Sequence, residues 1–273
     1  NATLCSVPDY LQPGDVPAAQ MSHGTATWSL IAANAPGRLF GEATQARFLL
    51  AKTEREGSET RIEEDHWVAA VEWADSIGVD IISSSLGYLD FPNQNPPFTY
   101  TYAQLNGDYA VTTIAADSAA KRGILVVVSV GNSGPDQRTL GSPADADSIV
   151  AVGATDSLGR LASFSSRGPT SDGRHKPEVV APGMSVTFAA MDSGLTRGNG
   201  TSFSAPLIAG LAALVQGTRL GRPAAELRLG LLAAASNRAT PNDSTGWGVP
   251  DAVKFLAFPT GLVPRGPSDT LLA

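Results

Sequence analysis

The chain has 273 residues, of which 42% are hydrophobic and 16% charged, as is typical of one globular α/β domain with a full core. Its formal net charge of −7 argues against a nucleic-acid partner, and its single cysteine, Cys5, excludes an internal disulfide framework. No apolar run reaches membrane-spanning length. The sequence begins at Asn1 without a signal peptide, as a mature chain or an excised domain would.

The first third of the chain predicts two helices and one short strand. Residues 1–22 are polar and turn-rich, with no convincing strand. Residues 22–33 indicate a loop that runs into an apolar helix, and a lone histidine there, His23, is more often capped or buried than catalytic. After an apolar strand at 46–51, a helix is expected over Ile62–Ile77, whose acidic residues 63–65 and His66 we interpret as solvated surface. Its broad apolar face holds Ile62, Trp67, Val68, Val71, Ala74 and Ile77.

The middle of the chain predicts three strands, a long loop and a helix. Strands are expected at 79–84, 124–130 and 148–154, and the second is continuously apolar, as in a parallel sheet covered on both faces. Residues 88–107 are rich in Pro, Asn and Tyr; we favour the rim of a substrate cleft, with a surface flap as the alternative. A helix over 108–122 should end at Gly123, where a C-terminal glycine is expected.

The last part contains short extended pieces at 161–167, 177–181 and 184–190, separated by Gly- and Pro-containing turns. Residues 207–215 are apolar on every side and predict a core helix, and a last helix is expected over 224–236. Residues 259–273 are linker-like, which leaves 1–258 as the domain. Alternating strands and helices predict a parallel sheet with ligands at the carboxyl ends of its strands, where residues 85–87 and 131–132 fall.

Ser202 lies where a glycine-rich stretch meets the buried helix. Free N–H groups and the helix dipole favour negative charge there, which suits an acyl-transfer nucleophile. Pro206 is tolerated if it falls in the first turn, where no intrahelical N–H is needed. The tripeptide Gly-Thr-Ser alone is more typical of a loop and a helix cap. Acyl transfer also needs a base and oxyanion donors, and the chain offers His23 and Asn132 for these roles.

Six motifs occur in the order found in subtilisin-like serine peptidases, and the chain resembles this family on them. The motifs are SHGT at 22–25, SLG at 85–87, GNSG at 131–134, FSSRGP at 164–169, KPEVVAPG at 176–183 and GTSFSAP at 200–206. A further motif, GWGVPDA at 246–252, extends the resemblance to about residue 257. Six motifs in register are a specific signal, which reverses the interpretation of each taken alone.

The resemblance implies an α/β fold of three layers, with a mainly parallel sheet flanked by helices, and a secreted or extracellular endopeptidase that acts on peptides or proteins. It implies Ser202 as nucleophile, His23 as general base and acid, and Asn132 as an oxyanion donor beside the Ser202 backbone N–H. The two walls that hold the substrate chain and its P1 side chain are then Ser85, Leu86 and Gly87 on one side, and Ser129, Val130 and Gly131 on the other.

Two further properties follow for the site. Neither wall carries a charge, so we expect a mainly apolar P1 pocket. Calcium is common in the family, but the sequence shows no ligand cluster to which it can be assigned, and no metal or other cofactor is assigned.

The chain departs from the family pattern before His23, where no Asp-Ser/Thr-Gly turn carries the triad Asp. Asp9 and Asp15 lie in a Pro-rich loop, and we interpret neither as that residue, so a separate N-terminal segment is expected to supply it. Smaller departures are Ser204, where alanine is usual, and Phe203 and Trp28, which either crowd the cleft or repack it.

Two other functions compete with the endopeptidase. A catalytically impaired fragment, or a non-catalytic relative that binds peptides in the same cleft, draws its support from the missing Asp. An esterase or lipase of the α/β-hydrolase type is set aside, because that fold needs Gly-x-Ser-x-Gly with the histidine after the serine.

Overall fold

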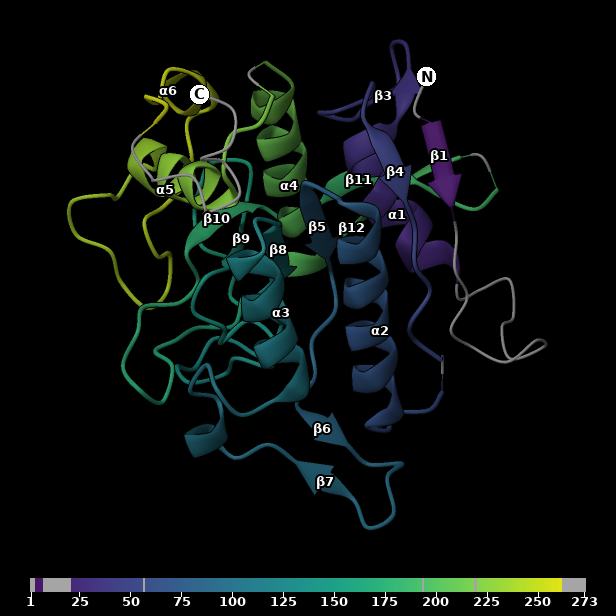
Figure 1. Cartoon of the computed structure of the whole chain (residues 1–273), viewed down its shortest axis with the longest axis vertical. Helices are drawn as coiled ribbons and strands as arrows, with labels where there is room; N and C mark the ends of the chain where they lie inside the picture. Colours follow the sequence, from purple (N-terminus) through teal and green to yellow (C-terminus); the bar gives the residue numbers. More distant parts are fainter. Residues whose placement is uncertain (1–2, 7–20, 56, 193, 219, 262–273) are drawn as a thin grey trace.

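A four-stranded parallel sheet lies at the centre of the fold (Figure 1). The computed structural model describes residues 3–6, 21–55, 57–192, 194–218 and 220–261. The strand order is β10-β9-β8-β5, and every neighbouring pair is parallel. The strands are β5 (Ile81–Ser84), β8 (Leu125–Ser129), β9 (Val150–Thr155) and β10 (Val179–Pro182). All four carboxyl ends therefore point to one edge of the sheet.

The central strands β8 and β9 are buried on both faces, as their apolar sequences predict. Successive side chains of a strand point to opposite faces, so each strand contributes to two cores. Leu125 and Val127 belong to the core on one side of the sheet, whereas Val126 and Val128 belong to the core on the other. The predicted three-layer α/β fold is confirmed.

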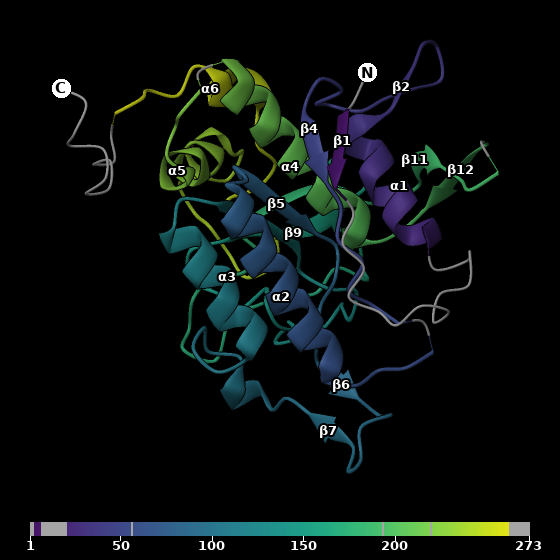
Figure 2. The same cartoon turned by 45° about the vertical axis from the view of Figure 1, so that its right-hand side comes forward.

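Helices cover both faces of the sheet (Figures 1 and 2). Helices α2 (Ile62–Ile77) and α3 (Val111–Lys121) contribute to one core, and α4 (Thr201–Thr218), α5 (Ala224–Ala234) and α6 (Ala252–Leu256) contribute to the other. Helix α1 (Met21–Ala32) packs against α4. Of the helices in the described ranges, none combines the length and the apolar character that a membrane crossing requires.

Four smaller strand pairs surround this framework. One is parallel and joins β1 (Thr3–Ser6) to β4 (Arg47–Leu49). The other three are antiparallel: β2 (Asn34–Ala35) with β3 (Leu39–Phe40), β6 (Asp90–Phe91) with β7 (Phe98–Thr99), and β11 (Val186–Ala189) with β12 (Leu195–Gly198). A short 3-10 helix, η2 (Tyr102–Gln104), follows β7.

Most of the predicted elements are confirmed, some with different ends. Helix α2 has the predicted bounds, whereas α3 begins later than predicted and α5 ends earlier. Gly123, just beyond α3, has a φ of 97°, the left-handed conformation expected of a C-terminal glycine. Residues 161–167 do not form a strand. Within this segment, Leu161 makes one isolated bridge to Thr155.

Two expectations about the N-terminal third are wrong. Residues 1–22 do contain a strand, β1, although this short segment has no strand pattern of its own. Its backbone is held extended by parallel pairing with β4. Helix α1 begins at Met21, so His23 lies in its first turn and not in a preceding loop.

The surface assigned to the start of α2 is also wrong. Glu63 and Glu64 are 1% and 0% exposed and His66 is half-buried, while Ile62 and Ile77 are about half exposed. Residues before and after the helix supply polar partners at this end: Tyr100 donates to Glu64 Oε1 at 2.7 Å, and the Arg55 N–H donates to Glu63 Oε1 at 3.0 Å.

Residues 88–107 contain the β6–β7 hairpin, the 3-10 helix η2 and an aromatic cluster. The ring of Phe91, 1% exposed, lies within 6.4 Å of the rings of Tyr88, Phe98 and Tyr100. Aromatic pairs at such distances stabilise a fold beyond the area they bury. The hairpin starts beside the carboxyl end of β5, so it fixes the segment that follows this strand.

Candidate functional site

A cavity of about 220 Å³ opens at the carboxyl ends of β5 and β8. The residues that line it come from the end of each strand, from the start of α4 and from two loops. They are Ser85, Leu86, Gly87, Leu89, Ser129, Val130, Gly131, Asn132, Ser133, Thr139, Gly141 and Ser202. The structure thus brings together both predicted substrate walls, the predicted oxyanion donor and the predicted nucleophile.

The lining of the cavity carries no ionisable side chain that is charged at neutral pH. Leu86, Leu89 and Val130 supply apolar surface, while the remaining lining residues are small or neutral. Leu89, Thr139 and Gly141 were not predicted from the sequence. They lie in loops, and no local sequence pattern indicates that these loops line the cavity. Burying a charge here without a partner would be costly, so the cavity suits a neutral group.

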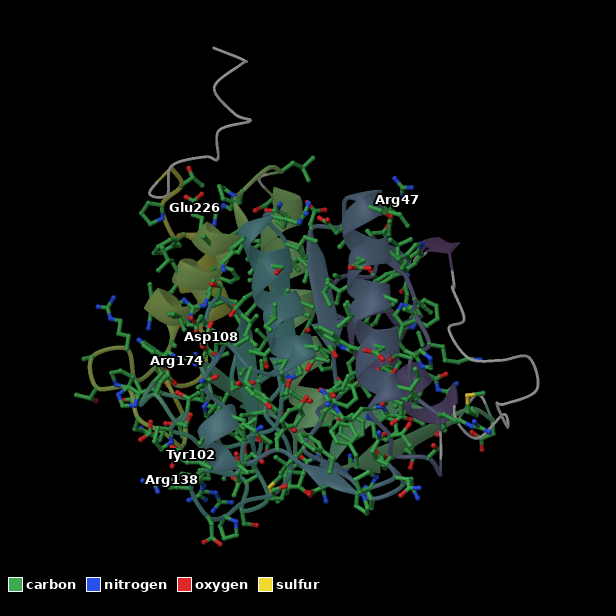
Figure 3. All side chains as sticks on the ribbon, turned by 60° about the horizontal axis from the view of Figure 1, so that its bottom comes forward. Arg47, Tyr102, Asp108, Arg138, Arg174 and Glu226 are labelled. Atoms are coloured by element: carbon green, nitrogen blue, oxygen red, sulfur yellow. The ribbon has the colours of Figure 1, made fainter. Side chains whose placement is uncertain are left out.

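The loop that carries Thr139 is held in place from outside the cavity. The Arg138 guanidinium lies over the ring of Tyr102, 5.0 Å from its centroid, and both side chains lie together in Figure 3. The Tyr102 hydroxyl in turn donates to the carbonyl of Thr170 at 2.9 Å. These contacts connect η2 to Thr170 and to the loop that carries Thr139.

Asn132 is oriented by the first residue of α4. Its Oδ1 accepts from the Thr201 N–H at 2.9 Å and from Thr201 Oγ1 at 3.0 Å. With Oδ1 so engaged, Nδ2 remains as the group of Asn132 that can donate to a ligand. Gly131 brings the chain to this position with a φ of 107°, and a Cβ there would lie 2.9 Å from Ser166 Oγ.

Ser202 is the second residue of α4 and makes two contacts with Ser85. Its Oγ donates to the Ser85 carbonyl at 3.4 Å, and Ser85 Oγ donates to the Ser202 carbonyl at 2.8 Å. Pro206 is the sixth residue of α4, so the expectation that it lies in the first turn is wrong. Proline has no N–H to donate to the Ser202 carbonyl four positions earlier, and the Ser85 hydroxyl donates to that carbonyl.

His23 lies in the first turn of α1 and is exposed; it is not among the residues that line the cavity. Ala26 and Leu30, on the same face of α1, form a small apolar cluster with Phe203, the residue after Ser202. This packing fixes α1 relative to the start of α4. Although the residue keeps an exposed surface, the surrounding protein partly desolvates the His23 imidazole and lowers its pKa below the ordinary value, which favours the neutral form that a general base requires.

The three departures noted in the sequence repack the surroundings, and none of them lines the cavity. Phe203 stacks on Phe188 with ring centroids 4.5 Å apart, and Trp28 makes an edge contact with Phe48. Ser204 Oγ donates to the carbonyls of Ala181 and Pro182, which ties α4 to the end of β10.

The remaining expectations concern acidic residues. Asp9 and Asp15 lie outside the described residues. Within the described ranges, no three side chains of His, Cys, Asp or Glu converge so as to hold a metal ion. We therefore assign no calcium ligands.

Comparison with known proteins agrees with the motifs. The family model described as "Subtilase family" matches residues 6–248. Subtilisin DY of Bacillus licheniformis is 38% identical over 172 residues, which cover 62% of this chain and 54% of the relative. Serine protease AprX of Bacillus subtilis (strain 168) is 31% identical, over 67% of this chain and 45% of the relative. The chain spans about half the length of these two proteins.

Solved structures of proteases share the fold. The prenylagaramide maturation protease PagA superposes with a TM-score of 0.75 at 26% identity, over 95% of this chain and 87% of that one. Sphericase superposes with a TM-score of 0.68 at 25% identity, over 84% of this chain and 77% of that one.

Proposed function

We propose that this chain, which belongs to the subtilase family, is a serine endopeptidase that hydrolyses peptide bonds through an acyl-enzyme formed on Ser202. One observation carries the proposal: Ser202, Asn132 and both wall segments line a single uncharged cavity at the carboxyl edge of the sheet. Structural neighbours that are proteases support the same class of reaction. The proposed substrates are peptides or proteins outside the cell.

In this mechanism a peptide lies between segments 85–87 and 129–131, with its P1 side chain in the cavity. Ser202 Oγ attacks the scissile carbonyl while His23 takes its proton and later gives it to the leaving amine. The developing oxyanion accepts from Asn132 Nδ2 and the Ser202 N–H. The position of Ser202 at the N-terminus of α4 adds a favourable dipole. Water then hydrolyses the acyl-enzyme, with His23 acting as base again.

A second candidate function is a catalytically impaired fragment, or a non-catalytic relative, that binds peptides in the same cleft. The observation that favours it is the absence from this sequence of an Asp-Ser/Thr-Gly turn before His23. Without a carboxylate on Nδ1, the imidazole is not held in the tautomer that accepts the serine proton. A separate N-terminal segment that supplies this carboxylate would restore the first function.

The test is labelling of the purified chain with a fluorescent fluorophosphonate, which forms a covalent bond only with an activated serine. Because the triad carboxylate is not found in this chain, we expect slow labelling at one site, lost in Ser202→Ala and slower still in His23→Ala and Asn132→Ala. Ser204→Ala is the matched control, because that serine lies outside the cavity on the same helix. Absence of labelling together with saturable binding of an apolar peptide would support the non-catalytic alternative.

A further inference from the structure

We propose that Ser85 is a positioning residue, whose hydroxyl replaces the helix hydrogen bond that Pro206 cannot make and thereby holds the nucleophile in place. The inference rests on the proposed function and adds to it a residue that acts through Ser202. Its starting point is the 2.8 Å hydrogen bond from Ser85 Oγ to the Ser202 carbonyl.

The need for this hydrogen bond follows from the position of the proline. In an α-helix the N–H of each residue donates to the carbonyl four positions earlier. The partner of the Ser202 carbonyl would be the N–H of residue 206, which proline lacks. A carbonyl left without a donor beside the helix core would be costly. Ser85 supplies that donor from a different element.

Ser85 is itself firmly placed. It follows directly on β5, whose last residue, Ser84, pairs with Val128 of β8. Ser84 is buried, and its Oγ accepts from Trp67 Nε1 of α2 at 2.9 Å. The sheet and α2 hold Ser84, and they therefore also fix the position of Ser85, whose hydroxyl donates to the Ser202 carbonyl.

The contact also joins the nucleophile to the substrate wall. Ser85 begins the wall segment 85–87, and its own carbonyl accepts from Ser202 Oγ at 3.4 Å. One residue thus fixes the backbone of Ser202 with its side chain and contacts the reactive hydroxyl with its backbone. Loss of the Ser85 hydroxyl should let the first turn of α4 shift relative to the wall, which separates the nucleophile from the scissile carbonyl.

The experiment is a double-mutant cycle between positions 85 and 206. Ser85→Ala is expected to lower kcat about tenfold with KM nearly unchanged, because the loss is of alignment and not of substrate contact. Ser85→Thr keeps the hydroxyl and should retain most of the activity. Pro206→Ala restores an N–H at the position that faces the Ser202 carbonyl. In that background, Ser85→Ala should cost less than about twofold in kcat.

A second readout does not depend on catalysis. Thermal unfolding of the parent chain, Ser85→Ala, Pro206→Ala and the double variant should show the same coupling. Ser85→Ala should lower Tm when residue 206 is proline, and much less when it is alanine. This measurement separates the role of Ser85 from the proposed endopeptidase function. Coupling in Tm without fluorophosphonate labelling would contradict the endopeptidase function and support the role of Ser85. Equal effects of Ser85→Ala in both backgrounds, on kcat and on Tm, would overturn the inference.

Discussion

For the single residue His23, the electrostatic environment makes a prediction about the pH dependence of the proposed reaction. Desolvation lowers the pKa of this imidazole, so its neutral form persists to lower pH than usual. A general base acts in its neutral form, and kcat/KM should therefore rise with pH through the pKa of the free enzyme's histidine. The direction of the shift fixes where that rise lies.

We expect the acidic limb of the kcat/KM profile to have its midpoint below about 6.5, the ordinary pKa of histidine. The measurement is hydrolysis of an uncharged peptide between about pH 5 and 8. His66→Gln is the control. His66 lies on α2 and contacts the Thr53 carbonyl, so its substitution should leave the profile unchanged. A midpoint well above 6.5 would contradict the prediction and would indicate a carboxylate beside His23, because an opposite charge raises the pKa of an imidazole.

Site residues that are carried by motifs could be predicted from the sequence, and their contacts could not. Asn132 and Ser202 fall in family motifs, so their shared cavity was predictable. The hydroxyl of Ser85 was not predicted to contact Ser202, because Pro206 was placed in the first turn of α4. An error in the start of one helix thus hid the contact.

At the scale of the element, the start of α2 contains a buried carboxyl that makes stability depend on pH. Glu63 is 1% exposed, and its Oε2 has no hydrogen-bond partner among the described residues. Burial raises the pKa of Glu63 to about 7, and the charges of Glu54 and Glu59 add to the effect. Since the folded pKa lies above the unfolded one, its contribution to stability is fully present below about pH 4.5 and is lost as pH rises through about 7.

Glu63→Gln keeps the shape of the side chain and removes its ionisation. We expect the variant to have a higher Tm than the parent chain at about pH 8 and a smaller loss of Tm between about pH 5 and 8. Glu64→Gln is the matched control: Glu64 accepts from Arg61 and Tyr100, so this change should lower Tm at both pH values. Parallel Tm curves for Glu63→Gln and the parent chain would show that Glu63 does not carry the pH dependence.

The two wall segments make a prediction about specificity. The lining of the cavity is uncharged, and Leu86, Leu89 and Val130 supply its apolar surface. We expect a peptide library to show a preference for neutral, mainly apolar P1 side chains, since a charged one would be buried without a counter-charge. Ser133→Asp places a carboxylate at the lining and should shift the preference toward Lys or Arg. A strong preference for a basic P1 side chain in the unsubstituted chain would contradict the prediction.

At the scale of the whole molecule, apolar periodicity was enough to predict the sheet, its parallel direction and the edge that holds the site. The continuous apolar run of β8 and the sequence pattern of α2 specify their elements locally. The strand β1 was missed, because its four residues carry no strand pattern and depend on β4 for their conformation. Burial of Glu63 was missed for a similar reason, since the segments that cover it lie apart in the sequence.

The strand β1 bears on the question of the missing carboxylate. The sequence predicts that no carboxylate of this chain orients His23, because the Asp-Ser/Thr-Gly turn is absent and residues 1–22 show no convincing strand. The structure removes the second reason, since Thr3–Ser6 pairs in parallel with Arg47–Leu49. The first reason stands, because the residues that follow β1 in the sequence contain no such turn. Asp9, three residues beyond the end of β1, is the position at which the inference can fail most directly.

We therefore predict that residues 1–273 alone are poorly active. For subtilisin, removal of the triad Asp alone costs roughly 3 × 10⁴ in kcat, and a loss of this order relative to subtilisin is expected here. Because neither Asp9 nor Asp15 is then part of the triad, Asp9→Asn and Asp15→Asn should each change kcat by less than about threefold. A preceding segment from the parent sequence, added in trans or fused before Asn1, should raise the rate. Full activity of the chain alone, abolished by Asp9→Asn but not by Asp15→Asn, would instead identify Asp9 as the residue that orients His23.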